Sequence, residues 1–191
     1  MKIRLLPGSN INFNLVEFLL PGMSNLFDGN FYNPTLGNLK AAGVIEEILN
    51  YISEKPDKFY DVIVGCDSSS GIEPHFPVAV VILRVGEGGR FFLRKISYKN
   101  RKFYNWHQRI LEEVLISCQL ALFLRENLEK RVKELKEDFN YQFRYIHADV
   151  GEAGQTKDMI KEVTGLIRGN GFEPKIKPES FVASTVADRY T

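Results

Sequence analysis

The stretch that decides the fold reads YDVIVGCDSSSG and covers residues 60–71. Its first seven residues are largely apolar and β-branched, which is typical of a strand buried on both faces of a sheet. The run stops at Asp67, and the serines and glycine that follow predict a turn. A second predicted strand, residues 142–149, also brings an aspartate, Asp149, to its carboxyl end. The sequence therefore predicts two buried strands with an aspartate at the same end of each.

The segments around these strands predict the rest of the fold. Apolar residues recur at helical spacing after Asn38, a plausible N-cap, and two strands flank the glycine-rich turn 86–89. The order is one helix followed by β-β-β-α-β-α-β-α, which indicates an α/β fold with a mixed five-stranded sheet flanked by helices. The first and fourth of these strands should be parallel, because a long helix connects them. The remaining predicted elements are strands 76–85, 90–98 and 172–177 and helices 105–138, 155–168 and 180–190.

The first 37 residues differ from this regular pattern. They contain three of the eight prolines, at Pro7, Pro21 and Pro34, together with several glycines and asparagines. We interpret residues 1–37 as an irregular N-terminal extension packed on a single domain formed by residues 38–191.

Composition excludes several classes of protein. The 25 basic and 24 acidic residues give a net charge of +1, which argues against a histone-like protein held to nucleic acid by bulk charge. The two cysteines, Cys66 and Cys118, cannot form a disulfide framework or a multi-cysteine zinc site and are predicted to be buried thiols. No apolar run approaches the roughly 20 residues that span a bilayer, and the N-terminus does not resemble a signal peptide. We therefore expect a cytoplasmic protein that does not enter the membrane.

The aspartates at the strand ends predict a cation site. Asp67 and Asp149 should lie side by side, because adjacent strands are about 4.8 Å apart, and two such carboxylates repel each other unless a cation lies between them. Oxygen ligands of this kind suit Mg²⁺ or Mn²⁺. Glu112 or Glu113 on the long helix and Asp188 on the last helix are further candidate ligands. Taken singly, adjacent glutamates on a helix are most often solvated, and an aspartate after a strand caps a turn as often as it binds a metal, so the prediction depends on the combination.

Four segments of the chain carry recognisable motifs. They are FYNPT (31–35), IVGCDSS (63–69), HADVG with GQTK (147–151 and 154–157), and IKPES with ADRY (176–180 and 187–190). The order of elements and the placement of the acids resemble the ribonuclease H-like fold, and the four segments resemble the uncharacterised YkuK family of that superfamily. One departure is Cys66-Asp67-Ser68-Ser69, where the family pattern is Thr-Asp-Ser-Gln.

The resemblance implies a metal-dependent nuclease. It places a catalytic, metal-binding tetrad on Asp67, Glu113, Asp149 and Asp188, which would hold two divalent ions and hydrolyse phosphodiester bonds of RNA or DNA. Glu113 fits the family's helix pattern better than Glu112, but the spacing of the residues leaves both open. His147, two residues before Asp149, is a possible proton shuttle, and a structural, hydrogen-bonded histidine is the alternative.

A basic and aromatic stretch indicates a nucleic-acid partner. Between Gly88 and Leu111 there are seven basic residues and no acid, with six aromatic residues interleaved. Basic side chains can neutralise phosphates while exposed aromatic rings stack on bases, although both can equally cover a sheet edge and a core. The predicted nucleic-acid-binding residues are Lys99, Arg101, Lys102, Tyr104 and Trp106.

Other functions fit the sequence less well. A metal-dependent adhesion domain needs a serine where Gly71 stands, an aspartyl phosphatase needs an acid where Ser69 stands, and ATPases with this core are generally far longer. The remaining alternative is a non-catalytic nucleic-acid-binding or interaction module that keeps the ribonuclease H-like fold. The sequence does not predict an oligomeric state or choose between RNA and DNA.

Overall fold

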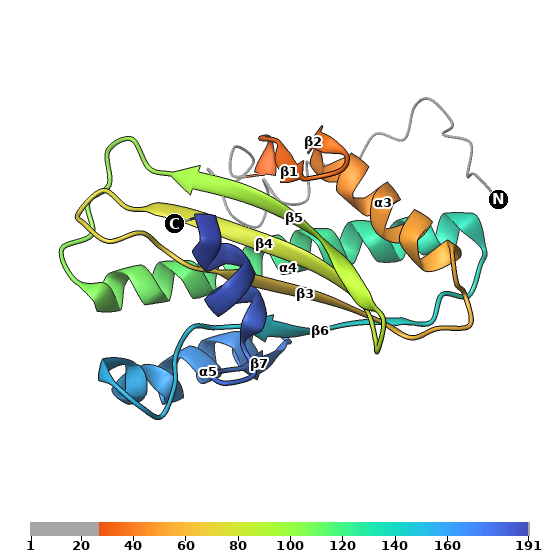
Figure 1. The fold of residues 1–191 in the computed structure, drawn as a ribbon. Coiled ribbons are helices and arrows are strands. Elements are labelled where there is room, and N and C mark those ends of the chain that lie inside the picture. The colour runs from red at the N-terminus through yellow and green to blue at the C-terminus, as the bar shows by residue number, and fades with distance from the viewer. Residues whose placement is uncertain (1–26, 191) are drawn as a thin grey trace.

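The computed structural model describes residues 27–190, which build a seven-stranded sheet in the order β2-β1-β5-β4-β3-β6-β7 (Figure 1). β3 pairs with β6 and β6 with β7 in parallel, whereas the other neighbouring strands are antiparallel. The strands are β1 (Phe31–Asn33), β2 (Gly37–Leu39), β3 (Tyr60–Cys66), β4 (His75–Arg84), β5 (Gly88–Ser97), β6 (Tyr141–His147) and β7 (Glu173–Lys175).

The centre of the sheet follows the predicted pattern. β3 lies between β4 and β6, and every one of its residues except Asp61 is buried. β3, β4 and β5 form an antiparallel meander, because short turns connect them, whereas β6 joins β3 in parallel after the long crossover through a helix. The mixed α/β sheet and the parallel pairing of the first and fourth predicted strands are thus confirmed.

The main core lies between the sheet and the helices on one of its faces. In Figure 1, α4 (Trp106–Leu135) runs behind the strands, and α3 (Ala41–Ser53) contributes side chains to the same core. α4 begins at Asn105, whose side chain accepts a hydrogen bond from the Gln108 amide, and ends at Lys136 in the left-handed conformation. Side chains of α5 (Ile160–Gly169) belong to the same buried cluster. Within residues 27–190, no helix is long and apolar enough to cross a membrane.

The C-terminal segment covers the opposite face. It consists of a π-helix, η2 (Val182–Ala187), followed by a short 3-10 helix, η3 (Asp188–Tyr190), and crosses in front of the strands in Figure 1. Gly65 of β3 allows this close approach, because a Cβ at that position would lie 2.8 Å from the backbone nitrogen of Ala183. The segment buries a second, smaller apolar cluster that includes Ile63 and Val182.

Several expectations from the sequence differ from the structure. The sheet has seven strands rather than five, because residues 31–39 form a small hairpin whose first strand pairs with β5. Asn38 belongs to β2, and α3 follows Lys40 without a side-chain cap. The helix expected from residue 155 begins as a 3-10 turn, η1 (Gln155–Met159). The expected N-terminal extension lies mostly in residues 1–26, outside the described part of the chain.

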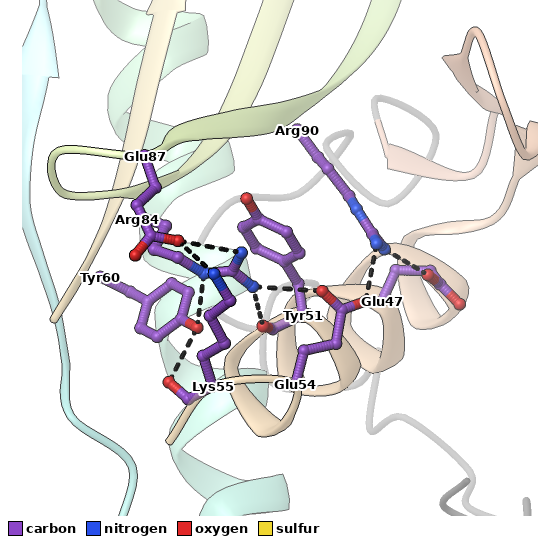
Figure 2. Close-up of polar contacts among 8 residues, drawn as sticks. All are labelled: Glu47, Tyr51, Glu54, Lys55, Tyr60, Arg84, Glu87 and Arg90. Carbon is purple, nitrogen blue, oxygen red and sulfur yellow. Dashed lines mark hydrogen bonds and ion pairs between the residues drawn. The ribbon is translucent and has the colours of Figure 1, made fainter. Parts of the chain in front are cut away.

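A polar cluster fastens α3 to the β4–β5 hairpin (Figure 2). The Arg84 guanidinium is 7% exposed and donates to the Tyr60 hydroxyl at 2.9 Å, to the Tyr51 carbonyl at 3.2 Å and to Glu54 at 3.1 Å. Arg90 reaches Glu54 at 2.7 Å from the next strand. The cluster lies at the start of β3, whereas Asp67 follows the other end of that strand.

Candidate active site

The ends of β3 and β6 bring Asp67 and Asp149 together. Gly65 pairs with His147 in the parallel ladder, so each aspartate lies two residues beyond the same rung of the sheet. Asp67 is held there by its amide, which donates to the Pro77 carbonyl at 3.1 Å, and Asp149 is flanked by backbone hydrogen bonds of its two neighbours. The carboxylates therefore project from one end of the sheet, as the strand pattern predicts.

Glu113 of α4 joins the two aspartates from the helical layer. Its side chain is 7% exposed, and its Oε1 accepts a hydrogen bond of 2.5 Å from the Ser68 hydroxyl. Burial raises the pKa of Glu113 to about 8; the Ser68 hydrogen bond opposes this shift, and the negative charges of Asp67 and Asp149 add to it. Glu113 thus belongs to the same electrostatic cluster as the two strand-end aspartates.

Asp188 reaches the cluster from the opposite face of the sheet. It begins η3, and its carboxyl group forms a side-chain hydrogen bond with Asp67. Burial raises the pKa of Asp67 to about 6; a hydrogen bond from the Ser68 backbone opposes this rise, and the charges of Asp149 and Asp188 contribute to it. The four acids proposed from the sequence therefore come from four separate segments, and Asp67 interacts with each of the other three.

The chemistry of the cluster suits a cation. Asp149 Oδ1 is buried without a hydrogen-bond partner, and carboxylates gathered at one place repel one another unless a positive charge is added. The side chains as placed do not form a finished coordination sphere, because no three His, Cys, Asp or Glu residues within 27–190 are arranged to hold a metal ion. The donor set fits Mg²⁺ or Mn²⁺ in kind, and binding would require local side-chain rearrangement.

Glu112 and Glu113 have different surroundings although they are adjacent and both buried. Glu112 accepts a hydrogen bond from the Tyr98 hydroxyl and forms an ion pair of 2.6 Å with Arg101. It thereby connects α4 to the loop after β5, while Glu113 faces Ser68 and the aspartates. Of the two glutamates left open by the sequence, the structure brings Glu113 to the acid cluster.

His147 is built into the support of the C-terminal segment. Its ring is 4% exposed, and Nδ1 accepts a hydrogen bond of 3.2 Å from the Val182 amide. Burial is the main cause that lowers the pKa of His147 to about 4, and the nearby Lys175 charge adds to this shift. The imidazole is therefore neutral at pH 7. These contacts give His147 a structural role, and its proposed action as a proton shuttle stays a prediction.

The basic and aromatic stretch divides into two parts. Arg90 and Arg94 pack toward α3 and β1, and Phe92 and Phe103 belong to the core. The exposed part is the loop between β5 and α4, which contacts the turn after β3 through a 2.8 Å hydrogen bond from the Phe103 amide to the Ile72 carbonyl. Of the five predicted nucleic-acid-binding residues, Trp106 is half-buried, and the exposed ones are Lys99, Arg101, Lys102 and Tyr104.

Lys177 is a site residue that the sequence reasoning did not assign. Its Nζ lies 2.9 Å from Asp149 Oδ2, on the carboxylate whose other oxygen is unpartnered. The segment that carries it, 176–180, belongs to one of the matching family motifs, which was the available signal. Ser68, one of the serines in the turn after Asp67, contacts Glu113 directly.

Comparison with known proteins adds a family and one curated relative. Residues 43–191 match the family model described as Ribonuclease H-like. The chain is 28% identical over 166 residues to "Uncharacterized protein YkuK" of Bacillus subtilis (strain 168), and the alignment covers 84% of this chain and 96% of that protein. No solved structure matches the chain.

Proposed function

Because this chain belongs to the ribonuclease H-like family, we propose that it is a divalent-metal-dependent nuclease that hydrolyses phosphodiester bonds of RNA or DNA. The observation that carries the proposal is the gathering of Asp67, Glu113, Asp149 and Asp188 at one end of the sheet, where burial, with a smaller contribution from neighbouring negative charges, raises the pKa values of Asp67 and Glu113. A cluster of this kind at the carboxyl ends of neighbouring parallel strands is a favoured place for ligand binding in α/β sheets.

The four carboxylates are the groups proposed to hold Mg²⁺ or Mn²⁺. When bound, such ions supply Lewis-acid activation of water and stabilise the leaving oxygen of the phosphodiester. Ser68 orients the Glu113 carboxylate through its hydroxyl, and burial of Glu113 keeps bulk water from this side of the cluster. A cation in the site would oppose the effects of burial and of the neighbouring negative charges on the pKa of Glu113, and so favour its ionised carboxylate at neutral pH.

The loop between β5 and α4 is proposed to hold the nucleic acid. Lys99 and Lys102 are exposed for contact with phosphates, and the Tyr104 ring is 74% exposed and available to stack on a base. The Glu112–Arg101 ion pair joins this loop to the turn of α4 that presents Glu113. The proposed binding loop is therefore fixed directly to the helix that bears one of the acids.

The test is a cleavage assay on labelled RNA, DNA and RNA–DNA hybrid with Mg²⁺ and with Mn²⁺. We expect cleavage of at least one substrate by the wild type and none by Asp67→Asn or Asp149→Asn. Asp61→Asn is the matched control. Asp61 lies on β3, the strand that leads to Asp67, but its side chain contacts Gln142 rather than the acid cluster. Cleavage that survives in either site variant would contradict the proposed site.

A non-catalytic nucleic-acid-binding module is the second candidate function. It is favoured by the absence, within residues 27–190, of three acids already arranged around a metal position. It predicts that the wild type binds nucleic acid but cleaves none of the substrates with either metal. That result would overturn the nuclease proposal and leave the binding loop as the functional part.

A further inference from the structure

A groove lies directly beside the acid cluster, in a part of the structure that the proposed function has not used. Its volume is about 630 Å³, and its walls are the loop 151–153 and the segment 174–179. Pockets of a few hundred Å³ are typical of small-ligand sites, so this groove is large enough for a nucleotide unit. Prolines, Ala153 and Ile176 line much of it, and its charged residues are two lysines, Lys175 and Lys177, and two acids, Glu152 and Glu179.

Lys177 lies where this groove meets the candidate active site. Its backbone amide donates to the Val150 carbonyl at 2.9 Å, which extends the β6–β7 pairing past Asp149. Gly151 permits this contact, because a Cβ there would lie 2.9 Å from the Lys177 Cβ. The backbone therefore fixes Lys177 beside Asp149, while its side chain, 49% exposed, is free to move between the carboxylate and the groove.

We propose, on the basis of the nuclease function above, that the groove binds the phosphodiester backbone next to the cleavage point, and that Lys177 moves from Asp149 to a phosphate oxygen when nucleic acid and metal bind. In the absence of both, the Lys177 ammonium compensates part of the negative charge of the acids. A divalent ion competes with this ammonium for the same carboxylate, and an incoming phosphate offers the lysine a new partner.

Exchange of the Lys177 partner couples the two ligands. A strand in the groove withdraws the lysine from Asp149 and so strengthens metal binding, and the metal strengthens strand binding by the same factor. Partly exposed ion pairs contribute up to about 1 kcal/mol, which corresponds to about a fivefold change in affinity. We therefore expect a coupling of roughly two- to fivefold.

The experiment is calorimetric titration of Mn²⁺ into the full-length protein, with and without a phosphorothioate oligomer of about ten nucleotides, as RNA and as DNA. We expect Lys177→Met to bind Mn²⁺ about two- to fivefold more tightly than the wild type without oligomer. The oligomer should raise the Mn²⁺ affinity of Lys177→Met by a smaller factor than that of the wild type, because only the wild type has a lysine to withdraw from Asp149. Lys177→Arg should behave like the wild type because it retains the charge.

Lys175→Met is the matched control, since Lys175 lines the same groove but pairs with Glu179 instead of Asp149. It removes the same charge and should leave the coupling as in the wild type. Equal Mn²⁺ affinities for Lys177→Met and Lys175→Met, with and without oligomer, would overturn the inference about Lys177. If the wild type still cleaves nucleic acid in that case, the proposed nuclease function stands without the inference. If no protein, the wild type included, binds Mn²⁺, both proposals fail.

Discussion

Replacement of Glu113 by glutamine should stabilise the protein in the absence of metal, and increasingly so as pH rises. In the folded protein the pKa of Glu113 is raised from its ordinary value of 4.5 to about 8, chiefly by burial. Between these values the folded chain retains a proton that the unfolded chain has released. The unfolded state therefore binds fewer protons, and the free energy of unfolding falls as pH increases through this interval. Asp67, whose pKa is raised to about 6, adds to the fall with the same sign.

The magnitude follows from the size of the interval. At 1.36 kcal/mol per pH unit, the full interval for Glu113 corresponds to about 5 kcal/mol, which is an upper bound because side chains relax around a buried charge. We expect Glu113→Gln to gain about 2 kcal/mol over the wild type at pH 8.5 and little below pH 4.5. Glutamine keeps an oxygen that can accept the Ser68 hydrogen bond, so packing is preserved.

The assay is urea unfolding of both proteins from pH 4.5 to 8.5, with chelator present, followed by circular dichroism. Glu112→Gln is the control, because it has the same chemistry one residue away but breaks the ion pair with Arg101. It should lose stability rather than gain it. A wild-type free energy of unfolding that does not fall between pH 5 and 8, or a Glu113→Gln variant without a gain at high pH, would refute the reasoning about the acid cluster.

Three further changes test other parts of the structure. Replacing Lys99 and Lys102 together by alanine should reduce the slope of log binding constant against log salt concentration by about 1.4 for single strands, because two phosphate contacts are lost. Arg84→Met should lower the free energy of unfolding by about 2–4 kcal/mol, since it leaves buried partners in the polar cluster without their donor. Gly65→Ala should lower the free energy of unfolding by about 1–3 kcal/mol and displace the C-terminal segment. Faster amide hydrogen exchange in that segment would detect the displacement.

The controls for these changes come from the same chain. Lys130 and Lys133 are exposed toward the far end of α4, and their double alanine variant should leave the salt slope unchanged. Arg90 makes ion pairs with α3 but is 34% exposed, so Arg90→Met should cost less than about 1 kcal/mol. A cost for Arg84→Met no larger than that for Arg90→Met, or normal amide protection of the C-terminal segment in Gly65→Ala, would contradict the corresponding prediction.

The central part of the fold could be predicted because its signals are local. The apolar run that ends at Cys66 and the helical spacing after Asn105 each specify one element, and the crossover between β3 and β6 then requires their parallel pairing. β1 and β2 are each three residues long, which is too short to show the alternating pattern of a strand in the sequence. η2 is a π-helix that packs closely against Gly65, and the helical spacing of its residues indicates neither feature.

The candidate site was predictable only to the level of residue type and strand end. Helical spacing left Glu112 and Glu113 open, because both border the apolar face of α4, and the resemblance to a family favoured Glu113. Tertiary partners separate them: Ser68 for Glu113 and Arg101 for Glu112. The position of Lys177 depends on backbone pairing that continues beyond β6 and β7. Its place in a matching family motif marked the segment but did not indicate this contact with Asp149.

The order in which the four acids occur along the chain has a consequence during protein synthesis. Asp67 follows β3 in the first half of the described chain, whereas Asp188 stands in η3, at its far end. The strands that support Asp67 and Asp149 are therefore synthesised before Asp188. Translation has to pass residue 188 before the whole cluster of acids can exist.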